Sequence, residues 1–199
     1  MAYELLPRLL RGMATELPGV VVHLHQHTSP VLVEMVRGGR LDLAIVRGPL
    51  AETRGLAVVG LTPERLVLAM PEGSAPGSDD EGIDLADAAG HRWALPLASA
   101  MPGLAEQALL VCHRAGVTPR DGARADTLVG LLTHVAHGGC VALVPESVRR
   151  ACPPGVAIRD LLGADPTTVI ENLAVRRVGE DDPVLTRISA LLPGPRHSG

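Results

Sequence analysis

The sequence predicts an α/β protein made of two small lobes that are joined by two crossover segments. Segments with apolar residues at helical spacing alternate with short β-branched runs along the chain. The stretches 71–82 and 163–166 are rich in Pro, Gly, Ser and Asp, as exposed linkers are. With 199 residues, 46% of them hydrophobic, the chain is long enough to bury the cores that such lobes need.

The first lobe is expected to begin with a helix over residues 4–17, because its leucines recur at helical spacing. A β-branched run then predicts a strand over 20–27. Ser29 is expected to cap the next helix, with Pro30 at its first position, where the missing N–H costs nothing. That helix covers 31–37 and ends at two glycines.

Two further strands are expected in the first half of the chain, over 41–46 and 66–70, because both are short and mostly apolar. The middle of the chain again alternates the two element types. We expect helices at 85–88, 104–115, 127–137 and 146–150, and strands at 91–96, 140–145 and 156–161. The last segments predict a strand at 169–176 and a helix at 183–192. We therefore assign 1–74 and 166–199 to lobe one and 75–165 to lobe two.

Composition excludes several classes of function. The formal net charge is −4 and the cations are not clustered, so we expect no binding to nucleic acid by this chain alone. No apolar run is long enough to cross a membrane, and the first residues lack the pattern of a secretory signal, so we expect a cytoplasmic protein with no membrane partner. The aromatic residues are Tyr3 and Trp93, which leaves almost nothing from which to build a ring-stacking pocket.

Cys112, Cys140 and Cys152 are odd in number, widely spaced and without a CxxC motif. This pattern predicts reduced, buried thiols rather than a disulfide framework. A redox pair of Cys140 and Cys152 is the less favoured alternative, since both flank one predicted strand and helix.

Four segments, in their order and spacing, resemble the effector-binding (substrate-binding-like) domain of LysR-type transcriptional regulators. They are LPRLL at 6–10, PGV at 18–20, GGRLDLAI at 38–45 and GGCVALVPES at 138–147. The resemblance covers nearly the whole chain. It implies two Rossmann-like lobes in the fold of type 2 periplasmic binding proteins, a small-molecule effector and a homodimer or homo-oligomer. In the family's dimers, the two subunits contact each other through the elements that match 5–17, 20–27 and 104–115.

The chain departs from this family at its start. The family's winged helix-turn-helix domain and linker helix have no counterpart here, so DNA would be bound only through a domain absent from this chain. The family also places a strand before the helix that matches 4–17, and that first strand of lobe one is missing from this sequence.

The best candidate binding residues are Thr28 and Ser29. A helix start offers free backbone N–H groups and partial positive charge to an anion, and two hydroxyls add directed hydrogen bonds. The alternative is that Ser29 only caps its helix. The resemblance favours binding, because the family's effectors contact the matching position between the lobes.

Further candidates follow three predicted strands, since ligands of open α/β sheets lie beyond the carboxyl ends of strands. Arg47 could pair with a carboxylate through its planar fork, or could be a solvated loop cation. Ser99 could donate a hydrogen bond to the ligand. The full candidate effector site is Thr28, Ser29, Arg47, Ala98, Ser99, Val144 and Pro145.

Other chemistry has weaker support. His23, His25 and His27 alternate along the predicted strand, but their spacing is too wide for one ion, so we expect no metal and no cofactor. His134 and His137 are expected to complement the negative end of a helix. Without a GxSxG motif, a cysteine beside a base or a phosphate-binding loop, we expect no enzyme.

The leading hypothesis is therefore a regulatory domain that binds a small, non-aromatic carboxylate between its lobes. Its alternatives are a solute-binding protein, which the absent signal sequence disfavours, and a regulator remnant with no ligand.

Overall fold

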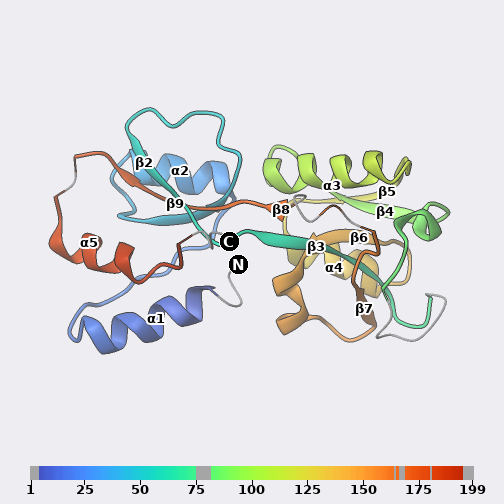
Figure 1. Ribbon diagram of the computed structural model, residues 1–199, viewed down its shortest axis with the longest axis horizontal. Coiled ribbons are helices and arrows are strands. Elements are labelled where there is room, and N and C mark those ends of the chain that lie inside the picture. The colour runs from blue at the N-terminus through green and yellow to red at the C-terminus, as the bar shows by residue number, and fades with distance from the viewer. Residues whose placement is uncertain (1–4, 75–81, 164, 166–168, 180, 195–199) are drawn as a thin grey trace. The chain divides into compact units, whose positions relative to one another are not determined.

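The computed structural model describes residues 5–74, 82–163, 165, 169–179 and 181–194 (Figure 1). Within them the chain forms two compact units. Unit 1 takes its residues from Met1–Pro63 and Glu171–Gly199, and unit 2 is Glu64–Ile170. The middle of the chain is thus one unit, and the two ends of the chain together make the other.

Unit 1 contains a three-stranded antiparallel sheet with the order β1-β9-β2. Its strands are β1 (Ala44–Arg47), β2 (Leu56–Gly60) and β9 (Asn172–Arg177). The central strand comes from the C-terminal part of the chain, with Ala44 opposite Val175 on one side and Val58 opposite Val175 on the other. Among the described residues, β1 is paired along one edge only.

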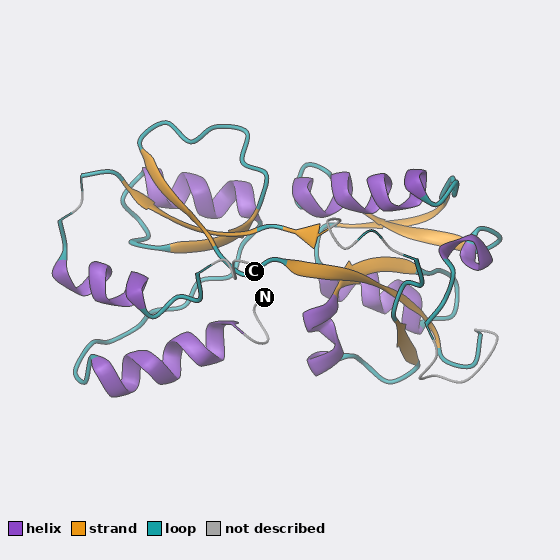
Figure 2. Cartoon of the chain, in the orientation of Figure 1, coloured by secondary structure: helices purple, strands orange, loops and turns teal. Residues whose placement is uncertain are grey.

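Helices cover both faces of this sheet (Figures 1 and 2). Helix α2 (Ser29–Arg37) packs Val33 and Val36 against Ala44 and Val46 of β1. The side chain of Ile45 points to the opposite face, because successive residues of a strand alternate. There it packs against α1 (Leu5–Glu16) and α5 (Pro183–Ala190). Strand β1 is therefore covered on both faces, with Ala44 and Val46 buried and Ile45 half-buried.

Unit 2 is organised around β3 (Glu64–Pro71), whose residues 66–70 are all buried. Strand β3 lies between β6 (Ala142–Pro145) and β7 (Val156–Arg159), and its first two residues pair with β8 (Val169–Ile170). Strands β4 (Arg92–Pro96) and β5 (Arg120–Ala125) form a parallel pair, which joins β6 through a bridge between Trp93 and Val141. The structure confirms the expected mixed α/β architecture.

The helices of unit 2 close one large core. They are the 3-10 helix η1 (Leu85–Ala88), α3 (Pro102–Arg114), α4 (Leu128–Ala136) and the 3-10 helix η2 (Glu146–Ala151). Both α3 and α4 pack against β4. Helix α3 is followed by Gly116 at φ 68° and α4 by Gly138 at φ 82°, conformations in which a side chain would be strained. Trp93, Leu104 and Leu131 are fully buried in this core.

Three predictions differ from the structure. Residues 20–27 form no strand; they are exposed, and no described segment pairs with them. Strands β2 and β5 were not predicted. The segment expected as a strand of lobe one at 66–70 is β3 and belongs to unit 2, because its hydrogen bonds go to β6 and β7. The boundaries between the two compact units fall at 63/64 and 170/171. The division into lobes at 74/75 and 165/166 stays a prediction.

The two predicted linkers lie largely outside the described residues, at 75–81, 164 and 166–168.

Candidate functional site

The start of α2 is the first candidate region. Thr28 is the N-cap residue, with extended backbone angles of φ −68° and ψ 154°, and its side chain makes no capping hydrogen bond. Ser29 is the first helical residue rather than the cap, so the predicted cap position was wrong by one residue. Because the first N–H groups of a helix have no partner within it, this corner offers donors to an anion. Both hydroxyl side chains are half-buried.

Arg47 lies at the same corner of unit 1. It is the last residue of β1, and its backbone N–H donates to Ser29 Oγ at 3.3 Å. This hydrogen bond holds the end of β1 against the start of α2. The predicted residues Thr28, Ser29 and Arg47 are thus brought together.

An acidic residue, Glu171, joins this corner although the sequence analysis did not select it. Its carbonyl accepts from Gly48 N–H at 3.0 Å, and a Cβ placed on Gly48 would lie 3.1 Å from its Oε2. Gly48 therefore permits a close approach of this carboxylate. The corner brings together the Ser29 hydroxyl, the backbone of Arg47 and the carboxylate of Glu171, hydrogen-bonding groups that suit a polar ligand.

Ala98 and Ser99 form a second candidate region, within unit 2. They lie exposed in the turn between β4 and α3. Leu97 N–H donates to Ala125 O at 2.8 Å, which fastens this turn to the end of β5. Because β4 and β5 are parallel, their carboxyl ends share one edge of the sheet, where ligands of open α/β sheets usually bind.

The start of α4 belongs to the same edge, and the sequence analysis missed it. Thr127 is its N-cap, and Oγ1 accepts from Gly130 N–H at 3.1 Å. The helix itself was expected at 127–137. Because β5 was not predicted, the sequence did not show that this helix starts at the same sheet edge as the turn of Ser99. Thr127 could have been selected from the sequence, because it is a hydroxyl residue at the start of a predicted helix.

Val144 and Pro145 are buried within unit 2. Val144 pairs with Val67 and Pro145 with Leu66 across the β3–β6 ladder, and Val144 belongs to the core. Both residues therefore pack within unit 2. Their role as the wall of a binding site stays a prediction.

The thiols and imidazoles form no cluster that could hold a metal ion among the described residues. All three cysteines are free; Cys112 and Cys140 are buried, as expected, while Cys152 is half-buried. Burial raises the pKa of the Cys112 thiol to about 11 and also raises the pKa of Cys140 and of Cys152. These thiols are therefore poor nucleophiles near neutral pH.

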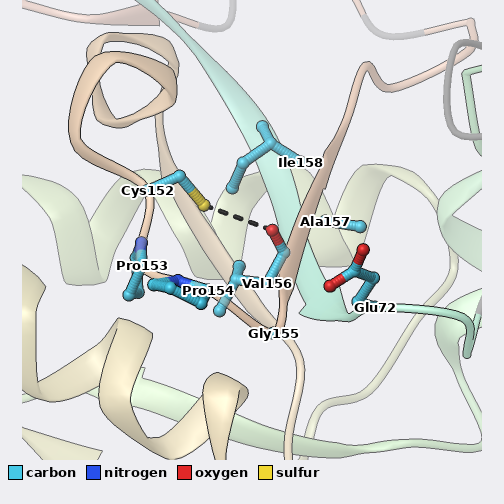
Figure 3. A pocket seen from close by; sticks show the side chains of 8 residues that line it. All are labelled: Glu72, Cys152, Pro153, Pro154, Gly155, Val156, Ala157 and Ile158. Atoms are coloured by element: carbon cyan, nitrogen blue, oxygen red, sulfur yellow. Dashed lines mark hydrogen bonds between the residues drawn. The ribbon is translucent and has the colours of Figure 1, made fainter.

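A hollow of about 320 Å³ lies elsewhere in unit 2, beside Cys152 and Glu72 (Figure 3). The Cys152 thiol donates to Val156 O at 3.3 Å. None of the predicted site residues lines this hollow.

In the part of the chain that the structure describes, no helix has the length and apolar character needed to cross a bilayer.

The decisive comparison is with the family model described as LysR substrate binding domain, which matches residues 1–192. The chain belongs to this family. The match confirms the resemblance carried by the LPRLL, GGRLDLAI and GGCVALVPES segments. The LysR substrate-binding domain has the type 2 periplasmic-binding-protein-like fold, which is the fold predicted for this chain.

Curated relatives of this LysR domain are transcriptional regulators. A probable hydrogen peroxide-inducible genes activator of Mycobacterium avium is 34% identical over 147 residues, 71% of this chain and 45% of the relative. TtuA, an HTH-type transcriptional regulator of Agrobacterium vitis, is 27% identical over 161 residues, 81% of this chain and 53% of the relative. The chain spans about half the length of the curated relatives it matches.

Solved structures agree on the fold of the LysR domain. The BenM effector-binding domain with its effector benzoate has a TM-score of 0.79 at 21% identity, over 95% of this chain and 84% of that chain. CbnR, a LysR family transcriptional regulator, has a TM-score of 0.81 at 23% identity, over 95% of this chain and 64% of that chain.

Proposed function

We propose that this LysR domain is the effector-sensing part of a transcriptional regulator and that its effector is a small, non-aromatic carboxylate. Family membership supports the regulatory role, and the corner of unit 1 supports the ligand class. We further propose that the domain acts as a homodimer in the cytoplasm, catalyses no reaction and reaches DNA only through another domain.

The observation that carries the ligand class is the hydrogen bond from Arg47 N–H to Ser29 Oγ. It fixes the backbone of Arg47 at the start of α2. A helix start favours an anion, and we propose that the Arg47 guanidinium adds to this preference. Glu171 at the same corner favours an effector that also carries a hydroxyl or amino group, because a carboxylate accepts such hydrogen bonds. Hydroxy and amino acids of a few carbons fit this description.

The test is isothermal calorimetry with a panel of aliphatic carboxylates, hydroxy acids and amino acids. For any acid that binds, Ser29→Ala should weaken affinity about tenfold or more, because a hydrogen bond to a charged group contributes about 1.5–3 kcal/mol. Arg47→Gln should weaken affinity at least as much, since it removes the charge and the fork. Ser99→Ala, tested in parallel, asks whether unit 2 contributes to binding of the same ligand.

Ser189→Ala is the matched control, because the Ser189 hydroxyl donates to Leu185 O within α5 of the same unit. It should leave affinity unchanged, and thermal unfolding without ligand measures any loss of stability in each variant. A carboxylate whose affinity is the same in Ser29→Ala, Arg47→Gln and wild type would refute the proposed site.

The proposed assembly is tested by sedimentation at micromolar concentration. A dimer is expected, and a single species near 20.7 kDa would refute it. A sequence-selective, salt-sensitive mobility shift with the isolated chain would refute the proposal that it needs another domain to bind DNA.

A further inference from the structure

Unit 2 has a second hollow, and the residues that line it have no role in the proposed function. It is a groove of about 630 Å³ between the C-terminal half of α4 and strands β4 and β5. Its lining residues are Arg92, Gly122, Ala123, Thr133, His134, Ala136, His137, Gly139 and Cys140. The groove lies wholly within one unit, and none of the predicted effector-site residues lines it.

The groove exists because small residues form its floor. Gly122, Ala123, Ala136 and Gly139 have at most a methyl side chain. At Gly122 a larger residue has no room, because a Cβ there would lie 2.8 Å from Cys140 Sγ and 2.8 Å from Arg92 Cβ. The floor is thus apolar and shallow, and it suits an aliphatic chain rather than a polar sugar or a flat ring.

The polar lining of the groove is basic. Arg92, His134 and His137 line it, and no lining residue is acidic, although the chain as a whole has a net charge of −4. Asp121 lies next to Gly122 in β5, but its carboxylate accepts two hydrogen bonds from Arg124, at 2.8 and 3.0 Å. This ion pair offsets the nearest acidic charge of β5, so the groove favours an anion.

Arg92 is placed to bind that anion. Its Nη2 donates to Gly122 O at 3.3 Å, which ties the side chain to the groove floor, and a guanidinium carries five N–H donors in all. The remaining donors match the two oxygens of a carboxylate. His134 lies in the last turn of α4 and His137, three residues later, is its C-cap residue, and both line the groove.

We propose that this groove is an accessory binding site for a small aliphatic carboxylate, independent of the effector corner at Ser29 and Arg47. Arg92 binds the carboxylate, His134 and His137 add ring N–H donors, and the Gly and Ala floor contacts the hydrocarbon. An open groove and a ligand of few atoms limit the affinity to about the millimolar range.

The probe is hexanoate, compared with hexanol and hexylamine at the same concentrations. Trp93 is the natural reporter, because it is the only tryptophan of the chain and directly follows Arg92 in β4. Hexanoate should give a saturable change in Trp93 emission, with backbone amide shifts in β5 and α4, and the neutral and cationic analogues should give none. Raised salt should weaken the binding.

Arg92→Gln should weaken hexanoate binding at least fivefold, and Ala136→Gln should abolish it by filling the groove from an exposed helical position. Arg150→Gln is the control, because Arg150 is exposed in η2 of the same unit and does not line the groove. Ser29→Ala and Arg47→Gln should leave this binding unchanged. Equal binding of hexanol, or unchanged affinity in both Arg92→Gln and Ala136→Gln, would overturn the proposal without affecting the effector corner.

Discussion

The two units solve the problem of the open sheet edge in different ways. In unit 2, β5 pairs with β4 on one side and carries Arg120, Asp121 and Arg124 on its exposed surface. In unit 1, β1 also pairs on one side only among the described residues. Its sequence before Arg47 is Ala-Ile-Val, and helices cover both of its faces.

Edge strands of soluble proteins are usually short or charged, because an apolar edge with free N–H and C=O groups pairs with other chains. Strand β5 is charged, whereas β1 has only four residues and is apolar up to Arg47. Residues 20–27 of unit 1 add a second unpaired segment, with Val21 78% exposed and Leu24 56% exposed. The edge strand β5 of unit 2 therefore carries charged residues. The edge strand β1 of unit 1 is apolar, as strands in the interior of a sheet are.

The largest effect is expected from truncation of the core of unit 2. Leu68 is fully buried in the central strand β3, so Leu68→Ala should reduce the free energy of unfolding by about 2–5 kcal/mol. The matched change in unit 1 is Val46→Ala, at a site that is 1% exposed, where about 1.5–3 kcal/mol is expected.

Urea unfolding followed by Trp93 fluorescence reports on unit 2, and far-UV circular dichroism reports on the whole chain. If the units differ as described, Leu68→Ala moves the fluorescence midpoint and Val46→Ala moves only the dichroism curve. Equal movement of both midpoints by both variants would show that the two units unfold as one.

Alkaline pH should also act on unit 2, because all three cysteines lie there. Burial raises the pKa of Cys112 from 9.0 to about 11, so between these values the thiol ionises in the unfolded chain but not in the folded one. The folded state then loses about 2–3 kcal/mol as pH rises from 9 to 11, and is unaffected below pH 9.

The measurement is the free energy of unfolding against pH for the wild type and for Cys112→Ala. The variant should show a flatter decline over this range, even though its stability at pH 7 is lower. The same decline in both proteins would mean that another group titrates.

These contrasts also explain which features the sequence could predict. Helices α1 and η1 and strand β6 were predicted to within two residues, because periodicity and helix-ending glycines are local signals. Strand β5 has the sequence RDGARA, without a β-branched residue, and it exists because β4 pairs with it. Residues 20–27 show the reverse case: the local pattern favours a strand, but a strand needs a neighbour.

The candidate site was predictable to a similar extent. Thr28, Ser29 and Arg47 were found because a helix start and a strand end are visible in the sequence. Thr127 and Glu171 were missed because their places depend on which strands pair. Val144 was selected for its position after a strand, while the β3–β6 ladder buries its side chain.

The smallest effect on stability is expected at the exposed segment of unit 1. Val21→Lys should change the free energy of unfolding by less than about 0.5 kcal/mol, because the side chain is mostly exposed. It should nevertheless reduce aggregation measured by light scattering, since a lysine opposes strand pairing between chains. Arg124→Val on β5 is the reverse change and should increase aggregation. Unchanged scattering in both variants would contradict the contrast between the two edges.

The position of β9 in the centre of the unit 1 sheet has a consequence for synthesis of the chain. As the polypeptide leaves the ribosome, α1, α2, β1 and β2 emerge before unit 2, but β1 and β2 do not pair with each other. Unit 2 is continuous from Glu64 to Ile170 and can fold as soon as it has emerged. The earlier strands must wait until Asn172–Arg177 arrives between them. The first half of unit 1 is therefore translated before unit 2 but completes its sheet after it, and in the interval it is open to chaperones and proteases.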